Sequence, residues 1–431
     1  MAETITLSRD AGLRRGIGPL GMAANVINYT VGASIFVVPA AAARFAGTWA
    51  PVAFGAAALG TLAITWCFAE AASRVPTSAG AYGFVEAAFG RYAGFLTGVF
   101  TYVANVLAAG AIAVAAADTL AALVPGLATS GARAALIIGW FVLLGFANLR
   151  GVKAAARLVE LATLIKLAPL ILFLVVGVSL IEPANLPLPI APLPRDFGRA
   201  LLLAVFLFAG VHGALSVGGE VRDPARTIPR AAILGMTGVT ILFVGAQLIA
   251  QGVLGSALAT SATPLADTMA RVSPALRLTM LVGAAISMTG WLASDALSTP
   301  RTLFAFARDG WLPAWLGVLD PRSHAPVRAV AVHLTLAAAL ALGGSYTALA
   351  LVSSLLLVSL FIMGCLAAAR LRTRDIARAG SPVRLPGLML AVVLGVGLMA
   401  WAGAQATGGE ALAWAGLVTA ASLWFWLARR G

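Results

Sequence analysis

The sequence predicts an all-α polytopic membrane protein with twelve transmembrane helices. Hydrophobic residues make up 61% of the 431 residues, charged residues make up only 10%, and the mean hydropathy is +0.96. This composition excludes an ordinary water-soluble domain. Apolar stretches long enough to cross a hydrocarbon core of about 30 Å recur along the whole chain, without a polar block large enough to fold separately. We therefore expect one domain embedded in the lipid bilayer.

The expected helices follow one another through short connections. Their approximate bounds are 17–43, 50–72, 86–117, 133–149, 158–181, 198–219, 231–255, 277–298, 326–343, 346–369, 387–404 and 410–428. Residues 1–16 contain Glu3 and Asp10 and lack a small-residue cleavage site, so they are expected to remain as a cytoplasmic N-terminal segment.

The distribution of basic residues predicts the orientation. The formal net charge of +13 arises mainly from arginines on alternate connections, which the positive-inside rule explains better than nucleic-acid binding does. The opposite connections hold only Arg44, Arg133, Arg195, Arg199, Arg271 and Arg277. Both termini are thus expected in the cytoplasm and the protein in the cytoplasmic membrane. Cys67 and Cys365 have no metal or redox spacing and are interpreted as packing residues.

Two of the expected helices are interrupted halfway across the membrane. In "NYTVGASIFVVPA", residues 28–40, Gly32, Ala33 and Ser34 replace bulky residues and Pro39 follows. The sixth helix has a similar cluster of small and polar residues at 209–213. Such clusters often mark close helix packing. An offset of five spans reverses the direction of crossing, however, and therefore favours two inverted repeats whose broken first helices expose backbone groups to a substrate.

Five segments, in order, resemble the amino acid/polyamine/organocation (APC) superfamily of permeases. They are "GASIFVVPA", "SRVPTSAGAYGFVEAAFGRYAGFLTG", "NLRGVKAAARLVELATLIKLAPLILFLVVG", "EVRDPARTIPRAAI" and "STPRTLFAFARDGWLP". The resemblance implies the LeuT-like fold, a five-plus-five inverted repeat with helices 1 and 6 broken. The repeats would cover residues 17–181 and 198–369, with two extra helices at 387–428. It also implies transport of amino acids or related small amines, by a monomer or homodimer without a cofactor or metal.

The resemblance also implies a substrate site at the two breaks. The substrate carboxylate would meet the N–H groups of Ala33, Ser34 and Ile35, and the amine would meet carbonyls near Thr30, Val31, Phe206 and Ala209. Phe206 would cover the substrate, unless it is an ordinary core or lipid-facing aromatic. The complete set of expected substrate-binding residues is Thr30, Val31, Gly32, Ala33, Ser34, Ile35, Asn105, Phe206, Phe208, Ala209, Gly210, His212 and Asp295.

Three ionisable residues within expected spans, His212, Asp295 and Lys166, are candidates for function because a charge is costly inside the membrane. His212 stands where many similar proteins have a glutamate, and it is either a titrating group or a neutral histidine bonded to a neighbouring helix. Asp295 lies four residues after Trp291, on the same helical face. Its possible partners are Lys166, Arg301 or a substrate amine, and a structural ion pair is an equal alternative. Asn105, Ser353 and Ser354 either line the site or bond between helices.

Lys166 in "LATLIKLAPLIL" lies several turns from either end of the fifth expected helix, which argues against a snorkelling side chain. The resemblance implies that its ammonium replaces a sodium ion between the first break and helix eight. We therefore expect sodium-independent transport, possible proton coupling, and an ion-coupling role for Lys166. The protonation states of Lys166 and His212 stay open.

The leading hypothesis is a secondary transporter of amino acids or small amines, with a polyamine or amine exchanger as an alternative. His333 and His324 are interpreted as structural. The scattered histidines form no catalytic cluster, so an intramembrane enzyme is disfavoured and no catalytic residue is expected. A channel would need a continuous polar lane, which the apolar spans do not supply. We expect a small-molecule substrate and no nucleic acid.

Overall fold

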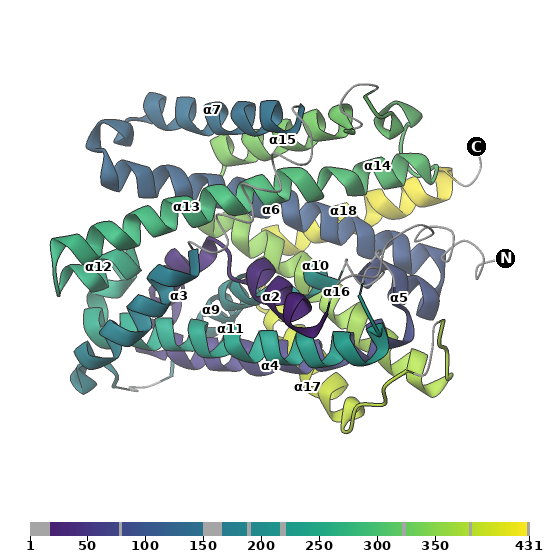
Figure 1. The fold of residues 1–431 in the computed structure, drawn as a ribbon, viewed down its shortest axis with the longest axis horizontal. Coiled ribbons are helices and arrows are strands. Elements are labelled where there is room, and N and C mark those ends of the chain that lie inside the picture. Colours follow the sequence, from purple (N-terminus) through teal and green to yellow (C-terminus); the bar gives the residue numbers. More distant parts are fainter. Residues whose placement is uncertain are drawn as a thin grey trace.

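The computed structural model describes residues 18–76, 80–149, 166–187, 191–215, 221–320, 325–378 and 382–428. This part of the chain is mainly helical, and its long helices run roughly along the long axis of the molecule (Figure 1). The N-terminal segment 1–16, the first half of the expected fifth helix and His324 lie outside the described residues.

Eight helical stretches in the described part are long and apolar enough to cross a membrane. They are Val38–Arg74, Arg91–Leu123, Ser130–Asn148, Pro194–Ala214, Pro224–Thr260, Pro274–Arg308, Tyr346–Thr373 and Gly408–Ala428. Shorter apolar helices cover Lys166–Leu180, Val327–Gly343 and Leu388–Ala404. Helices satisfy all their central backbone groups internally, which hydrocarbon requires. The prediction of an α-helical, polytopic membrane protein is confirmed.

In the described part of the chain the helices have the following bounds: α2 Pro19–Thr30, α3 Val38–Ala46, α4 Ala50–Arg74, α5 Ala81–Phe89, α6 Arg91–Leu123, α7 Ser130–Leu149, α9 Pro194–Phe208, α10 Val211–Ala214, α11 Pro224–Leu254, α12 Pro264–Ala270, α13 Pro274–Ser298, α14 Pro300–Arg308, α15 Val327–Gly343, α16 Tyr346–Thr373, α17 Leu388–Ala404 and α18 Gly408–Ala428. Short 3₁₀ turns complete the connections, among them Ser34–Phe36 and Gly255–Thr260.

Some helix bounds differ from those expected. The third expected helix, 86–117, starts instead at Arg91, because Gly90 with φ +90° separates α6 from the short helix α5. That left-handed conformation is readily adopted only by glycine. The seventh, 231–255, starts earlier at Pro224, and Pro229 is accommodated in its first turns. The separate helices α5, α12 and α14 were not predicted.

The core lies where α4, α11 and α16 pack against the short central helices α2, α9 and α10, and α6 packs against α16 (Figure 1). Small residues allow these helices to approach closely: a Cβ at Gly364 of α16 would lie 2.1 Å from the ring of Phe68 on α4. Such close packing is a main source of helix association in membranes. In the same interface, the buried free thiols Cys67 of α4 and Cys365 of α16 neighbour each other.

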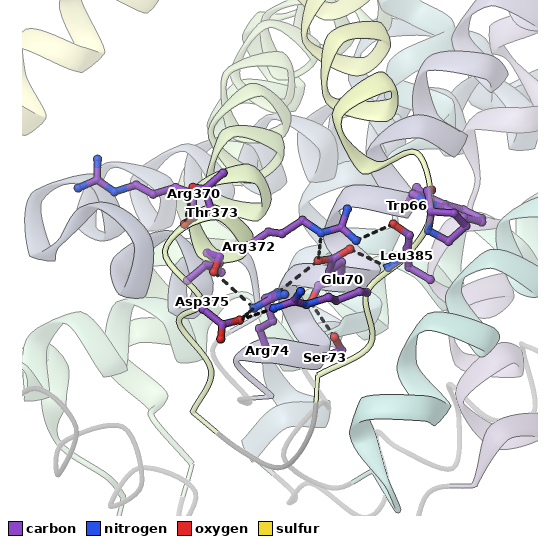
Figure 2. Close-up of polar contacts among 12 residues, drawn as sticks. Trp66, Glu70, Ser73, Arg74, Arg370, Arg372, Thr373, Asp375 and Leu385 are labelled. Carbon is purple, nitrogen blue, oxygen red and sulfur yellow. Dashed lines mark hydrogen bonds and ion pairs between the residues drawn. The ribbon is translucent and has the colours of Figure 1, made fainter.

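A buried ionic network connects α4 to the segment between α16 and α17 (Figure 2). Glu70 and Arg74 of α4 are both fully buried and pair at 3.3 Å, and Arg372 approaches Glu70 at 3.2 Å. The second oxygen of Glu70 accepts the backbone N–H of Leu385 at 3.0 Å. Arg74 also reaches Asp375, and hydrogen bonds from Arg384 and then Arg74 lower the pKa of that exposed carboxyl. The network therefore holds residues 374–378 and 382–387, the described parts of the connection between α16 and α17, against α4.

Candidate functional site

The first helix is broken between Thr30 and Val38. The N–H of Val31 still bonds to Ile27, but Gly32 turns back onto the carbonyl of Thr30 at 2.8 Å. A short 3₁₀ turn, Ser34–Phe36, follows before α3 begins. The N–H groups of Ala33, Ser34 and Ile35 donate to no other described residue. The break thus presents three free donors, which suit an anionic group such as a carboxylate.

The second break separates α9 from α10. α9 ends at Phe208, Ala209 has extended backbone, and Gly210 begins the short turn Val211–Ala214. The carbonyl of Gly210 accepts the N–H groups of Gly213 and Ala214. At the end of α9 the carbonyl of Phe206 accepts the N–H of Ala209 at 3.3 Å, so the regular helical pattern stops at this point.

The two breaks touch each other. A Cβ on Gly210 would lie 2.2 Å from the Thr30 hydroxyl oxygen and 2.5 Å from its Cα. A Cβ on Gly213 would lie 2.2 Å from the ring of Tyr29, and Asn25 donates to the carbonyl of Ala214 at 3.0 Å. The structure therefore brings together the two segments that the sequence selected, although they are about 180 residues apart.

Aromatic side chains pack beside the breaks. The Phe206 ring meets Tyr346 of α16 edge-on, with centroids 6.3 Å apart, and the Tyr346 hydroxyl lies close to Ser34. Phe208 instead packs against Phe243 of α11, with centroids 5.2 Å apart. On the other side, a Cβ on Gly32 would lie 2.9 Å from the indole of Trp291. Tyr346 thus lies beside residues of both breaks. It was not among the residues expected at the site.

Lys166 lies against the first break. Its side chain is buried, and its Nζ donates to the carbonyl of Asn28 at 2.7 Å. From α13, the buried hydroxyl of Ser287 donates to the carbonyl of Gly32 at 3.3 Å. The helix Lys166–Leu180 and α13 therefore both supply donors to carbonyls at the broken end of α2. Ser287 was not among the expected residues, because a single serine in an apolar helix carries little signal.

Asp295 has partners that the sequence analysis did not name. One carboxylate oxygen accepts the Thr299 hydroxyl at 2.5 Å, and the other lies 2.8 Å from Nε2 of His333 on α15. Asn105 of α6 donates to the Thr299 hydroxyl at 3.3 Å. Lys166 and Arg301, the expected partners, form no ion pair with Asp295. His333, interpreted as a lone structural histidine, is therefore paired.

The remaining candidates have separate surroundings. His212 is buried, its ring meets Phe361 of α16 at 5.8 Å, and its Nδ1 has no hydrogen-bond partner among the described residues. Ser353 donates across the helix interface to the carbonyl of Ala104, whereas Ser354 bonds within its own helix. The two serines therefore have packing roles in this structure.

Comparisons with known proteins identify the family to which the chain belongs. The amino acid permease family matches residues 17–425. An uncharacterized transporter of Mycobacterium bovis is 33% identical over 76% of this chain and 74% of its own. A branched-chain amino acid permease of Bacillus subtilis is 26% identical over 89% of this chain and 87% of its own. A serine/threonine exchanger of Bacillus subtilis is 27% identical over 85% of both chains. The chain therefore belongs to the amino acid permease family and is a membrane transporter, not an enzyme.

Proposed function

We propose that this protein is a secondary active transporter that moves an amino acid across the cytoplasmic membrane by alternating access. The observation that carries the proposal is the meeting of the two helix breaks at Thr30 and Gly210. The free N–H groups of the first break would bind the substrate carboxylate, and carbonyls of both breaks would bind its amine. Phe206 would cover the substrate from the second break.

The proposal includes the topology expected from the sequence. Helices would cross the membrane twelve times, as two inverted repeats of five and two further helices, α17 and α18, with both termini in the cytoplasm. The two interruptions, one between α2 and α3 and one between α9 and α10, support this arrangement because α4, α6, α7 and the apolar helix Lys166–Leu180 lie between them along the chain.

The substrate class rests on the site and on the relatives. Two of them are named for branched-chain amino acids and for serine and threonine. Asp295 is already bonded to His333 and Thr299, which leaves it poorly placed to bind the second amine of a polyamine. A neutral amino acid is therefore the proposed substrate, ahead of a polyamine.

Counterflow in proteoliposomes tests this function. Vesicles loaded with one unlabelled amino acid at a time should take up the same labelled compound when it is the substrate. A thermal-shift screen of amino acids and polyamines on the purified protein selects the compounds, since a ligand that binds the native state raises its stability. A channel would equilibrate label without accumulating it, and that result would overturn the proposal.

Lys166→Ala is expected to lower transport by roughly 10- to 150-fold. The reason is the loss of a charge-assisted hydrogen bond to the carbonyl of Asn28, worth about 1.5–3 kcal/mol. Because the ammonium would replace a cation at the break, transport by the parent should not need sodium. Uptake in sodium-containing and sodium-free buffer measures both points, with Lys166→Arg as the control that keeps the charge. A strict sodium requirement, or full activity of Lys166→Ala, contradicts the assignment.

His212→Gln is expected to change the pH profile of transport. His212 is buried directly after the second break, and its Nδ1 is unpartnered among the described residues. Glutamine keeps hydrogen-bonding groups but does not titrate. Initial rates of counterflow at equal pH on both sides, measured from about pH 5 to about pH 8, give the profile. An unchanged rate and profile would return His212 to a structural role.

A further inference from the structure

A second group of ionisable residues lies apart from Lys166 and His212, between α13 and α15. Nε2 of His333 is 2.8 Å from Oδ2 of Asp295, and the two side chains are 0% and 5% exposed. This is the only buried pair of a histidine and an acid among the described residues. The proposed binding of substrate at the breaks does not use it.

The hydrogen bonds around the pair determine where a proton can bind. Thr299 donates to Oδ1 of Asp295, and its oxygen in turn accepts from Asn105. With an ionised Asp295, which accepts at both oxygens, the bond to Oδ2 uses the Nε2–H form of His333. In this neutral form of the ring, Nδ1 carries no proton and can accept one. Nδ1 of His333 and the hydroxyl of the neighbouring Tyr102 are both buried without a partner in the described part of the chain.

The net charge of Asp295 and His333 changes when Nδ1 of His333 binds a proton. With a neutral His333, the buried pair carries one uncompensated negative charge, which is costly in a low-dielectric interior. Adding a proton at Nδ1 gives an imidazolium beside a carboxylate and a net charge of zero. The proton comes from and returns to water, and no other bond is made or broken.

Other ionisable groups near the pair do not supply this compensation. Tyr29 of α2 and Tyr102 of α6 face Asp295. The charged residues on α13 and on helices packed against it have other surroundings: Lys166 donates to the carbonyl of Asn28, Asp118 pairs with Arg133, Asp267 with Arg277 and Arg308 with Asp309, while Arg91 lies over Trp311, Arg328 donates to Trp315 and Arg301 is exposed. A proton is therefore the cation that fits the pair.

We propose that Asp295 and His333 form a proton-binding site that couples transport to the proton gradient, with Nδ1 of His333 as the atom that takes the proton. This inference rests on the proposed transport function and names its coupling ion. Tyr29 provides the connection to the substrate site. It lies beside Ser298 and Asp295, it precedes Thr30 of the first break, and its ring packs on Gly213 of the second. A change of charge at the pair thus acts directly on the end of α2.

The test separates net proton-driven transport from exchange, which moves no net proton. Proteoliposomes containing the parent, His333→Gln, Asp295→Asn or the control His324→Gln receive a ¹⁴C-labelled mixture of the L-amino acids. Uptake is measured with a pH difference between about pH 6 and about pH 8, in either direction, and without one. Counterflow of the same mixture is measured at equal pH.

For the parent and His324→Gln we expect the pH difference of one polarity to raise accumulation several-fold. For His333→Gln and Asp295→Asn we expect accumulation to fall to the level without a gradient, while the counterflow of His333→Gln stays within about twofold of the parent. A parent that exchanges amino acids but ignores the gradient overturns the proton site and leaves the transport function intact. A parent without counterflow overturns the transport function itself.

Gradient-driven accumulation retained by His333→Gln would also overturn the site and make the pair structural. If either variant loses counterflow as well, ¹⁵N-histidine NMR of the purified parent decides the matter. Of the three histidines in the chain, His333 is identified as the signal missing from His333→Gln. Spectra recorded at the two pH values of the gradient, about pH 6 and about pH 8, should show the additional proton on Nδ1 of His333 at the lower value. A His333 signal that is the same at both values contradicts the proposal.

Discussion

Gly210→Ala is expected to abolish transport although it adds a single methyl group. The new Cβ would lie 2.2 Å from the hydroxyl oxygen of Thr30 and 2.5 Å from its Cα. A backbone atom cannot rotate away, so one of the two breaks must shift. Overpacking of this kind typically costs about 1–3 kcal/mol, and here the displacement falls on the segments that would bind substrate. Counterflow of an accepted amino acid measures the loss.

The control for this prediction is Gly238→Ala on α11. A Cβ at Gly238 has no neighbour within 4 Å, so this variant should transport at the parent rate. The backbone of Gly210 has φ −168°, an extended conformation open to any residue, and the comparison therefore isolates the contact with Thr30. Gly32→Leu should fail in the same way, because its Cβ would meet Trp291 at 2.9 Å. Normal insertion and parental transport by Gly210→Ala would remove the breaks from the site.

Glu70→Gln is expected to cause the largest loss of stability of any single substitution considered. Glu70 is fully buried and faces Arg74 at 3.3 Å and Arg372 at 3.2 Å. The amide keeps the shape of the side chain but removes the one buried negative charge that, among the described residues, both guanidinium groups contact. Breaking a buried pair by removing one partner costs about 3–5 kcal/mol. Thermal unfolding of the detergent-purified protein should therefore begin at a clearly lower temperature.

Arg384→Gln is the matched control within the same network. Arg384 pairs with Asp375 at 3.1 Å, but the two side chains are 66% and 71% exposed. Exposed pairs contribute little, since water and salt screen them. The melting temperature of this variant should stay near that of the parent. Equal melting temperatures for Glu70→Gln and the parent would show that the buried network does not stabilise the fold.

Long apolar stretches made much of the helical architecture predictable. The expected second and twelfth helices, 50–72 and 410–428, agree closely with Ala50–Arg74 and Gly408–Ala428, because length and hydropathy alone define such segments. Short amphipathic helices such as α5 and α14 lack that signal. The start of α6 depends on one glycine with positive φ, a conformation that composition does not reveal.

The candidate site was likewise predictable only in part. Small residues at mid-span located both breaks, and the resemblance to known permeases placed Lys166 near the first one. The partner of Asp295 could not be predicted, because helical spacing relates Asp295 only to neighbours on its own helix, such as Thr299. Which helix lies opposite is a property of the packing. His333 is 38 positions away in the sequence, and a lone histidine in an apolar helix does not indicate its partner.

The two native cysteines have a practical consequence for spectroscopy. Cys67 and Cys365 are fully buried and face each other inside the interface between α4 and α16. Thiol reagents attack exposed thiolates, so both should resist maleimide and nitroxide labels in the folded protein. A cysteine introduced on an exposed loop could then be labelled selectively without removing either native thiol. Pairs of such labels would allow fluorescence or electron paramagnetic resonance distances to follow the movement of the broken helices in an otherwise unaltered protein.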